Sequence, residues 1–469
     1  MTTSTELGTR PVGRLLLKFS LPCVTGLLIG ALYNIADQIF IGHSSLGYLG
    51  NAATGISFPI VCIANALAWC IGDGAAAYLS LCAGRRDSER AHRCVGTGIA
   101  ATVLVGLLFS ALCLIFCEPL MSLFGASEAT LPIACSYFRI LSAFFIPYLL
   151  LNVMNSMIRA DGSPAFAMCA MLSGAVLNVV LDPICIFWLD WGIHGAAVAT
   201  VIGQVLSCLL CIVYFRRPKT LRLSLRSFVP DISVLNRVLL LGSSTFVTQI
   251  SLVVMTLVSN LLLFRYGALS VYGSDIPISV FSIQTKVYTI VGQIAVGIAL
   301  GGQPILGYAY GAGRMDRVRE TYRLIQTASM TVCIAATLLF VFCPQPIIRL
   351  FGEQSPLCMD FAVLSFRLFL GLSFVTAFIK NSSVFFQSIG RPVEATLASV
   401  LRDILCFPLL ALLLCVVLED HQPGNGICGI LIASPLADII AGSAVIALTV
   451  RFFRRPKRTI APLPCPEQA

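Results

Sequence analysis

The recurrence of long apolar segments constrains this chain more than any other feature. From about Leu15 almost to the C-terminus they follow one another, each long enough to supply the roughly 20 residues that cross the hydrocarbon core of a bilayer. Inside lipid, backbone N–H and C=O groups have to bond within their own segment, which favours helices. Only 11% of the residues are charged, against roughly 25% in soluble domains. The sequence therefore predicts an all-α polytopic membrane protein.

The distribution of positive charge predicts how the chain crosses the membrane. The formal net charge of +9 is gathered mainly in four basic stretches, at 85–93, 216–226, 314–323 and 451–458. Even numbers of apolar segments separate these stretches, so all four fall on one side, which the positive-inside rule identifies as the cytoplasm. The simplest arrangement has about twelve transmembrane helices in the cell membrane, with both termini cytoplasmic. The positive charge then reports topology, and we expect the lipid bilayer rather than a nucleic acid as the partner of this surface.

The two halves of the chain resemble each other. AGRRD at 83–87 returns as AGRMD at 312–316, PLMSLFG at 119–125 as PIIRLFG at 346–352, YFRIL at 137–141 as SFRLF at 365–369, and RADGSP at 159–164 as QSIGRP at 387–392. The order is the same and the separation nearly constant, which indicates an internal duplication. Each half holds an even number of spans, so the repeats share one orientation and are related by an axis along the membrane normal. This predicts a six-helix lobe at 1–215, a basic linker at 216–235, a second six-helix lobe at 236–453, a cytoplasmic tail at 454–469, and a cavity between the lobes.

One segment, LYNIADQIFIGH at 32–43, places polar residues at the end of an apolar run. Asn34, Asp37 and Gln38 are spaced i, i+3 and i+4, so they project from one side of a helix. A carboxylate facing lipid costs a few kcal/mol, so Asp37 is expected to face the bundle interior or a hydrated cavity. The alternative is that Asp37 lies in the headgroup region beside His43 and only marks the helix end.

A second polar group lies further along the first half. Asn178 and Asp182 share a helix face at i, i+4 and are followed by Pro183, which loosens the local hydrogen-bond ladder. Thr200 and Gln204 repeat this spacing in GIHGAAVATVIGQ, a helix rich in small residues. At about 1.5 Å per residue, Asp37, Asp182 and Thr200 all fall in the outer half of the first lobe. Such a group suits a monovalent cation such as Na⁺, or a proton shared between neighbouring carboxylates.

These motifs resemble the multidrug and toxic compound extrusion (MATE) transporters over essentially the whole chain. The resemblance rests on the NxxxD of 178–182, the GxxGAAxAT of 192–200, the acid of LYNIAD and the two AGR turns. It implies two six-helix lobes forming a V, alternating access, and export of cationic or amphipathic compounds in exchange for Na⁺ or H⁺. It also implies that the coupling ion binds at Asp37, Asn178, Asp182 and Thr200. The seventh span departs from some relatives because it carries no acid: Leu263 stands opposite Asp37.

Further polar or adaptable residues are candidates for contact with substrate or for charge pairing. The candidates for the substrate cavity are Asn34, Gln38, Asp73, Gln204, Asn260, Gln284, Lys286, Met154 and Met157. Asp73 stands between two glycines, which suits burial against the other lobe as well as exposure to the cavity. In the second lobe, Lys380 and Asp403 fall at one depth and, with the adjacent Arg402, could form a structural ion pair or contact a substrate or proton.

Two other functions stay open at this stage. A membrane-embedded enzyme would need a nucleophile with a base or a metal set, but the four histidines form no HExxH motif or cluster, and no GxxxxGK[ST] is present. A flippase for lipid-linked oligosaccharides would need a cationic cavity, which Lys286 and Lys380 favour and Asp37, Asp73 and Asp182 oppose.

Most of the 19 cysteines lie inside apolar runs and are interpreted as buried apolar residues. We therefore predict a transporter that acts as a monomer on small molecules, with no cofactor and no metal other than a coupling Na⁺.

Overall fold

The computed structural model describes residues 7–43, 48–128, 130–219, 231–273, 275–349 and 355–454. Within these residues the chain is helical, and ten helices are long and apolar enough to cross a membrane. Two further pairs of helices pass the same test together but are bent, by 54° and 45°. Counting each bent pair as one span gives twelve, which agrees with the predicted number.

The first lobe contains the spans before residue 220. They are α2 (Val12–Gly42), α3 (Tyr48–Arg85), α4 (Ser88–Ile115), the bent pair α6 (Leu131–Ala143) and α7 (Phe145–Ala160), α8 (Pro164–Pro183) with the π-helical turn η1 (Ile184–Trp188), and α9 (Gly192–Arg216). A short helix, α5 (Cys117–Leu123), precedes the bent pair.

The second lobe repeats this series span by span. It consists of α10 (Ile232–Leu269), α11 (Asp275–Gly311), α12 (Met315–Phe342), the short α13 (Pro344–Arg349), the bent pair α14 (Pro356–Phe369) and α15 (Ser373–Ser388), α16 (Pro392–Val400), the π-helical turn η3 (Leu401–Cys406), α17 (Phe407–His421) and α18 (Gly426–Arg454). Gly162 and Gly390, from the matched RADGSP and QSIGRP motifs, both adopt positive φ, at 85° and 79°. The predicted duplication is therefore confirmed in the fold. Parts of the predicted linker and tail, 220–230 and 455–469, lie outside the described residues.

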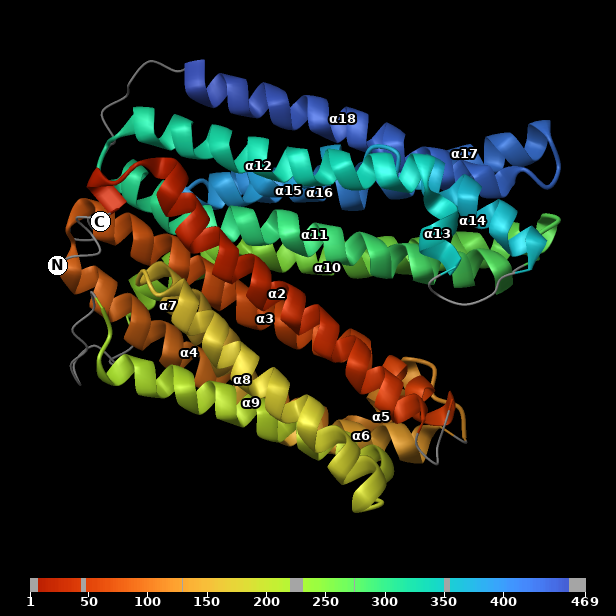
Figure 1. Cartoon of the computed structure of the whole chain (residues 1–469), viewed down its shortest axis with the longest axis horizontal. Coiled ribbons are helices and arrows are strands. Elements are labelled where there is room, and N and C mark those ends of the chain that lie inside the picture. Colours follow the sequence, from red (N-terminus) through yellow and green to blue (C-terminus); the bar gives the residue numbers. More distant parts are fainter. Residues whose placement is uncertain are drawn as a thin grey trace.

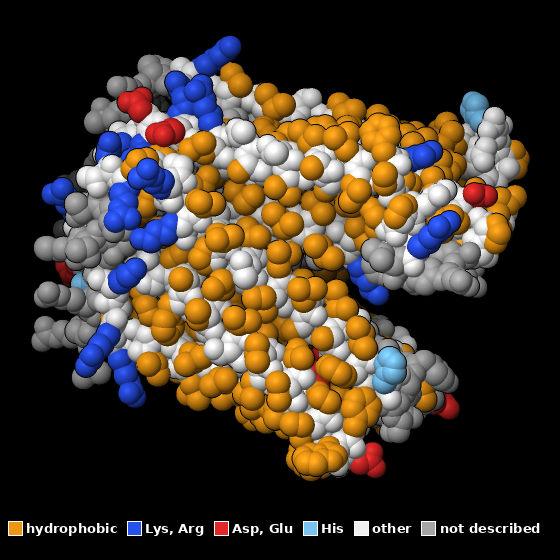
Figure 2. Space-filling view, in the orientation of Figure 1, with side chains coloured by type: hydrophobic (Ala, Val, Ile, Leu, Met, Phe, Trp, Pro, Cys, Tyr) orange, Lys and Arg blue, Asp and Glu red, His pale blue; other side chains and the backbone are white. Residues whose placement is uncertain are grey.

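The lobes touch at one end and separate towards the other (Figure 1). Three helix pairs make the main contacts at the closed end: α3 against α10, α2 against α11, and α3 against α11. A Cβ on Gly242 of α10 would overlap the backbone of Cys70, and a Cβ on Gly297 of α11 would lie 2.8 Å from the Cα of Val24. Glycines therefore allow the backbones to approach closely at these crossings. The space-filling view shows an opening between the lobes at the other end (Figure 2).

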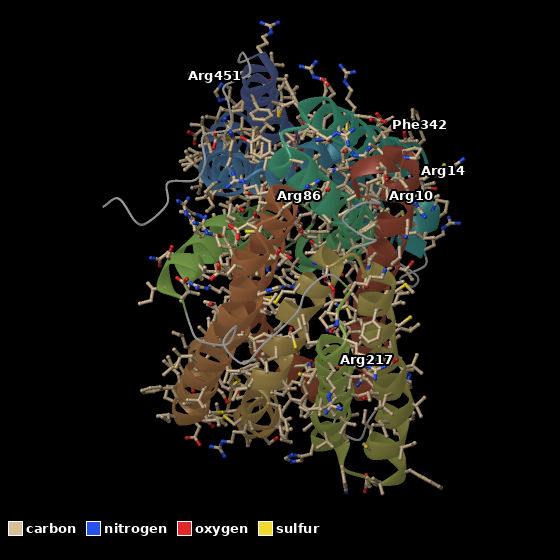
Figure 3. All side chains as sticks on the ribbon, turned by 90° about the vertical axis from the view of Figure 1, so that its left-hand side faces the viewer. Arg10, Arg14, Arg86, Arg217, Phe342 and Arg451 are labelled. Atoms are coloured by element: carbon tan, nitrogen blue, oxygen red, sulfur yellow. The ribbon has the colours of Figure 1, made fainter. Side chains whose placement is uncertain are left out.

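Basic side chains gather at the closed end. Figure 3 looks onto that end, and the arginines labelled there come from both lobes: Arg10 and Arg14 at the start of the chain, Arg86 after α3, Arg217 after α9 and Arg451 in α18. We call this the basic end and the other the open end.

The described cysteines are free thiols.

Candidate functional site

The geometry of the candidate ion site begins with close packing of α8 on α9. A Cβ on Gly203 of α9 would lie 2.6 Å from the carbonyl oxygen of Gly174 of α8 and 3.2 Å from the Cβ of Asn178. A Cβ on Gly195 would lie 2.6 Å from the carbonyl oxygen of Cys185 in η1. The glycines of α9 thus let this helix lie directly against α8 and its π-helical extension, and π turns of this kind are frequent at functional sites.

This packing brings three predicted side chains together. The Nδ2 of Asn178 donates to Oδ1 of Asp182 at 3.1 Å, within α8, and lies 3.4 Å from Oγ1 of Thr200 on α9. Asn178 is 3% exposed and Asp182 fully buried, while Thr200 is half-buried. An amide, a carboxylate and a hydroxyl therefore converge inside the first lobe.

Asp37 approaches the same place from α2. A Cβ on Gly26 or Gly30 of α2 would lie about 4 Å from Met168 or Met171 of α8, so this side of α2 packs on α8. Asp37 follows Gly26 by eleven residues, which is about three helical turns, and so lies on the same side. Asp37 lies close enough to Asp182 for the two carboxyl groups to interact electrostatically. The two carboxylates predicted to cooperate thus lie on facing helices.

The oxygens of this group are not all satisfied by the protein. Oδ1 of Asp37, Oδ1 of Asn178 and Oδ2 of Asp182 are buried and have no hydrogen-bond partner among the described residues. Leaving a buried polar atom unpaired costs about 1–3 kcal/mol, so three in one place indicate a site built for something the protein itself does not supply. Carboxylate, amide and hydroxyl oxygens suit a hard monovalent cation, and two adjacent carboxylates also suit a shared proton. In the described chain, no cluster of three or more His, Cys, Asp or Glu side chains forms a candidate metal site.

Two tyrosines near this group escaped the sequence reasoning. Tyr33 on α2 and Tyr137 on α6 both lie within electrostatic range of Asp37 and Asp182. Tyr33 precedes Asp37 by four residues, a spacing that could have shown it to lie beside Asp37 on the helix. Tyr137 comes from a distant segment, so only the fold reveals its position.

Four of the predicted cavity residues have exposed side chains: Asn34 and Gln38 on α2, Asn260 on α10 and Lys286 on α11. Asn34 also donates back to the carbonyl of Gly30 at 2.6 Å, within its own helix. Gln204 is half-buried on α9.

Asp73 is buried at the contact between lobes rather than exposed to the cavity. Its side chain is 7% exposed and pairs with Arg159 of α7 at 3.2 Å, and Ser156 donates to it at 2.9 Å. Gln303 of α11 approaches the Asp73 carbonyl at 3.4 Å across the lobe boundary. Gly74 fits against the backbone of α10, because a Cβ there would overlap Val238. The glycine that follows Asp73 thus lets α3 pack closely on α10, which places the acid in the closed end.

Three other cavity candidates are packed inside their lobes. Met154 and Met157 are 2% and 0% exposed and belong to apolar clusters of the first lobe, where the Met157 side chain fills the space above Gly98. Gln284 is 1% exposed and accepts a hydrogen bond from Ser365 at 2.7 Å. These side chains contribute to packing because the helix sides that bear them turn inward.

The charges of the second lobe pair differently from the expected Lys380–Asp403 contact. Arg402 binds Asp403 at 2.6 Å and also Asp438 of α18 at 2.7 Å, and Thr376 donates to Asp438 at 2.8 Å. Lys380 instead lies over the ring of Tyr288, with its Nζ 5.7 Å from the ring centroid. Asp403 thus pairs with Arg402 rather than with Lys380, and the guanidinium group of Arg402 has enough N–H donors to bind two carboxylates at once.

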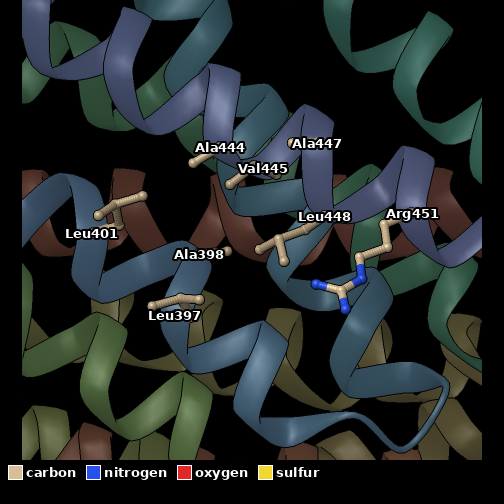
Figure 4. Close-up of a pocket in the computed structure, with 8 residues that line it drawn as sticks. All are labelled: Leu397, Ala398, Leu401, Ala444, Val445, Ala447, Leu448 and Arg451. Atoms are coloured by element: carbon tan, nitrogen blue, oxygen red, sulfur yellow. The ribbon is translucent and has the colours of Figure 1, made fainter.

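An apolar groove of about 290 Å³ lies away from all of these residues (Figure 4). It runs between α16 and α18, with Leu397, Leu401 and Leu448 on its walls and Arg451 at one end. None of the predicted site residues lines it.

Comparisons with known proteins agree with this arrangement. A sequence profile of the MatE family matches residues 22–184 and 245–416, one stretch in each lobe. The multidrug export protein MepA of Staphylococcus aureus (strain MRSA252) is 26% identical over 411 residues, covering 85% of this chain and 87% of MepA. The MepA of Staphylococcus haemolyticus (strain JCSC1435) is 25% identical over 406 residues, covering 85% of this chain and 86% of that protein.

Solved structures show the same fold. A crystal structure of a MATE protein in complex with MaL6 superposes with a TM-score of 0.87 at 24% identity, covering 96% of this chain and 98% of that one. A multidrug resistance MATE family transporter in an outward-facing conformation gives a TM-score of 0.86 at 23% identity, with 96% and 98% covered. The profile match in both lobes, together with the duplicated fold, shows that the chain belongs to the MatE family, the multidrug and toxic compound extrusion transporters that its sequence resembles.

Proposed function

We propose that this transporter exports cationic or amphipathic compounds in exchange for Na⁺ or H⁺ bound at Asp37, Asn178, Asp182 and Thr200. The observation that carries the proposal is the set of buried, unpartnered oxygens on Asp37, Asn178 and Asp182. The MepA relatives are named as multidrug export proteins, which supports the substrate class. The chain is thus a transporter rather than an enzyme.

Coupling follows from where the site lies. Asp37 is on α2, whose inner half packs on α11 of the other lobe and whose outer half borders the opening. Two carboxylates facing each other repel, and a bound cation or proton removes that repulsion and draws α2 towards α8. This movement changes the cleft wall formed by Asn34 and Gln38. An ion can shift the conformational equilibrium only by its differential affinity for the two states, so an ion that binds more tightly in the outward-open state favours that state. The altered cleft wall then binds substrate less tightly.

The orientation completes the cycle. The basic end is placed in the cytoplasm of a cell-membrane protein by the positive-inside rule, with both termini and the 216–235 linker on that side. The opening between the lobes then faces outward. Substrate leaves through it when the ion binds, and the return to the inward-open state carries the ion into the cell.

Transport in proteoliposomes tests the proposal. A fluorescent cationic dye is loaded, and a Na⁺ gradient and a pH gradient are imposed separately on wild type and on Asp182→Asn. Glu118→Gln is the matched control, because Glu118 is an exposed carboxylate of the same lobe, paired with Arg139 at 2.9 Å. Gradient-driven export by wild type and Glu118→Gln but not by Asp182→Asn supports the proposal and names the ion. Equal export by all three proteins overturns the site assignment.

A further inference from the structure

We propose that Lys286 on α11 is the specificity-determining group of the cleft and selects substrates that carry an anionic group, namely amphipathic zwitterions with a carboxylate, sulfonate or phosphate. The inference rests on the proposed function. It adds a substrate class that contact with acidic groups alone would not select.

The side of α11 that bears Lys286 is fixed by glycines further along the helix. A Cβ on Gly297 or Gly301 would collide with Val24 or Ser20 of α2, so this side of α11 faces α2. Lys286 precedes Gly297 by eleven residues, about three helical turns, and so projects from nearly the same side. Ser282 and Gln293 share it at i−4 and i+7 from Lys286. Towards the open end, where the lobes separate, this side of α11 becomes a polar wall of the opening.

The register between the two helices sets the depth of Lys286. Gly301 meets Ser20 and Gly297 meets Val24, so each residue forward along α2 matches one residue backward along α11. Continuing this register places Lys286 level with Ile35, between Asn34 and Gln38. Gln38 follows Ser20 by eighteen residues, a whole number of helical turns, and so turns to the same side as Ser20. Lys286 therefore stands across the cleft from the polar end of α2, at a depth about half a helical turn from that of Asp37.

Asn260 of α10 adds a neutral polar group to the same wall. Gly242 of α10 meets Cys70 of α3 at the lobe boundary, and Asn260 follows Gly242 by eighteen residues, so it too turns towards the first lobe. Figure 2 shows basic surface on the second lobe beside the opening.

Lys286 has no partner among the described residues, in contrast to Arg402 and Lys380 of the same lobe. Its side chain is exposed, and it forms no ion pair, hydrogen bond or ring contact in the described parts of the chain. Arg402 is held by two carboxylates, and Lys380 covers the ring of Tyr288 on the far side of α11 from α2. An unpaired ammonium within a membrane-embedded opening is costly to desolvate, and an anionic ligand that pairs with it offsets this cost.

The opposite walls therefore differ in charge. Asp37 lies just behind the α2 wall and attracts a cationic group when no ion is bound, whereas Lys286 attracts an anionic group from the α11 wall. A molecule with an apolar body and both charges satisfies the two walls together. Loss of one charge-assisted hydrogen bond weakens binding by about tenfold or more.

Two dyes of nearly equal shape test this assignment in the full-length protein in proteoliposomes. Rhodamine B carries a cationic xanthene and a free carboxylate, and its ethyl ester keeps the cation and lacks the carboxylate. Initial export rates are measured below saturation for wild type, Lys286→Gln, Lys286→Arg and Arg265→Gln. Arg265 is the matched control because it is an exposed cation of α10 on the side turned away from Gly242.

The expected result is a loss of about tenfold in rhodamine B export by Lys286→Gln, less than twofold change with the ester, and near-complete rescue in Lys286→Arg. Arg265→Gln exports both dyes normally. Equal effects of Lys286→Gln on both dyes, no effect on either, or export of the ester alone by wild type overturns the role of Lys286. Export of neither dye by wild type under any gradient is a different result, because it contradicts the proposed function itself.

Discussion

Gly203 of α9 lies directly against the backbone of Gly174 of α8, so closely that a Cβ on Gly203 would lie 2.6 Å from the Gly174 carbonyl oxygen. The same Cβ would lie 3.2 Å from the Cβ of Asn178, the residue that links Asp182 to Thr200. The proposed ion site thus depends on a helix contact that only glycine permits.

Gly203→Ala should separate α8 from α9 and weaken both stability and coupling. Overpacking of this kind costs about 1–3 kcal/mol, and the shift lengthens the contact from Asn178 to Thr200. Thermal unfolding in detergent and gradient-driven dye export would both decline. Gly292→Ala is the control, since nothing lies within 4 Å of a Cβ at Gly292. Normal coupling in Gly203→Ala would show that the α8–α9 contact does not shape the site.

Gly242→Ala should loosen the closed end. A Cβ there would overlap the Cys70 backbone, so α10 has to move away from α3. Since this contact holds the lobes together at the closed end, we expect passive dye leak through the protein to increase and uphill export to fall. Dye retention in proteoliposomes without an ion gradient measures the leak. Retention equal to that of Gly292→Ala would contradict the prediction.

Asp73→Asn should destabilise the protein more than loss of both members of its ion pair. Removing the acid leaves Arg159, whose side chain is 13% exposed, without its counter-charge, at a cost of up to about 3–5 kcal/mol, whereas Asp73→Asn with Arg159→Met removes both charges. Melting temperatures of the two single variants and the double variant form a cycle that isolates the pair. Additive losses would mean that the two side chains act independently.

Arg402→Met should be more destabilising than Asp403→Asn. Loss of Arg402 leaves two buried carboxylates without a counter-charge, whereas loss of the Asp403 charge leaves Arg402 paired with Asp438 and Thr376 still donating to that acid. Thermal unfolding of both purified variants gives the comparison. Equal melting temperatures would show that Arg402 does not hold the two acids together.

The twelve spans and their duplication could be predicted from the sequence because apolar length and repeated motifs are local properties. The grouping of Asn178, Asp182 and Thr200 also follows from helical spacing, since α8 and α9 are neighbours in sequence and in space. Asp37 needed an estimate of depth, and the glycines at 26 and 30 later explained which side it faces.

The remaining residues depend on contacts between distant segments. Helical spacing does not reveal whether Asp73 turns to the cavity or to Arg159, which lies on another helix. Lys380 was predicted to pair with Asp403 because the two residues fall at the same depth. In the structure Arg402, which is adjacent to Asp403, pairs with both Asp403 and Asp438. Met154 and Met157 are buried because the orientation of α7 within the lobe is set by tertiary packing.

The central claim is that Asp182 and Asp37 bind the ion whose movement is coupled to export. Coupling between two binding sites is reciprocal, so a dye gradient has to drive ion movement as surely as an ion gradient drives dye. The most direct measurement is ion uptake, by ²²Na⁺ or an internal pH indicator, in proteoliposomes that contain wild type, Asp37→Asn or Asp182→Asn and hold only a dye gradient. We predict opposite movement of dye and ion in wild type and no ion movement in either variant. Dye-driven ion movement that persists in Asp182→Asn would contradict the account.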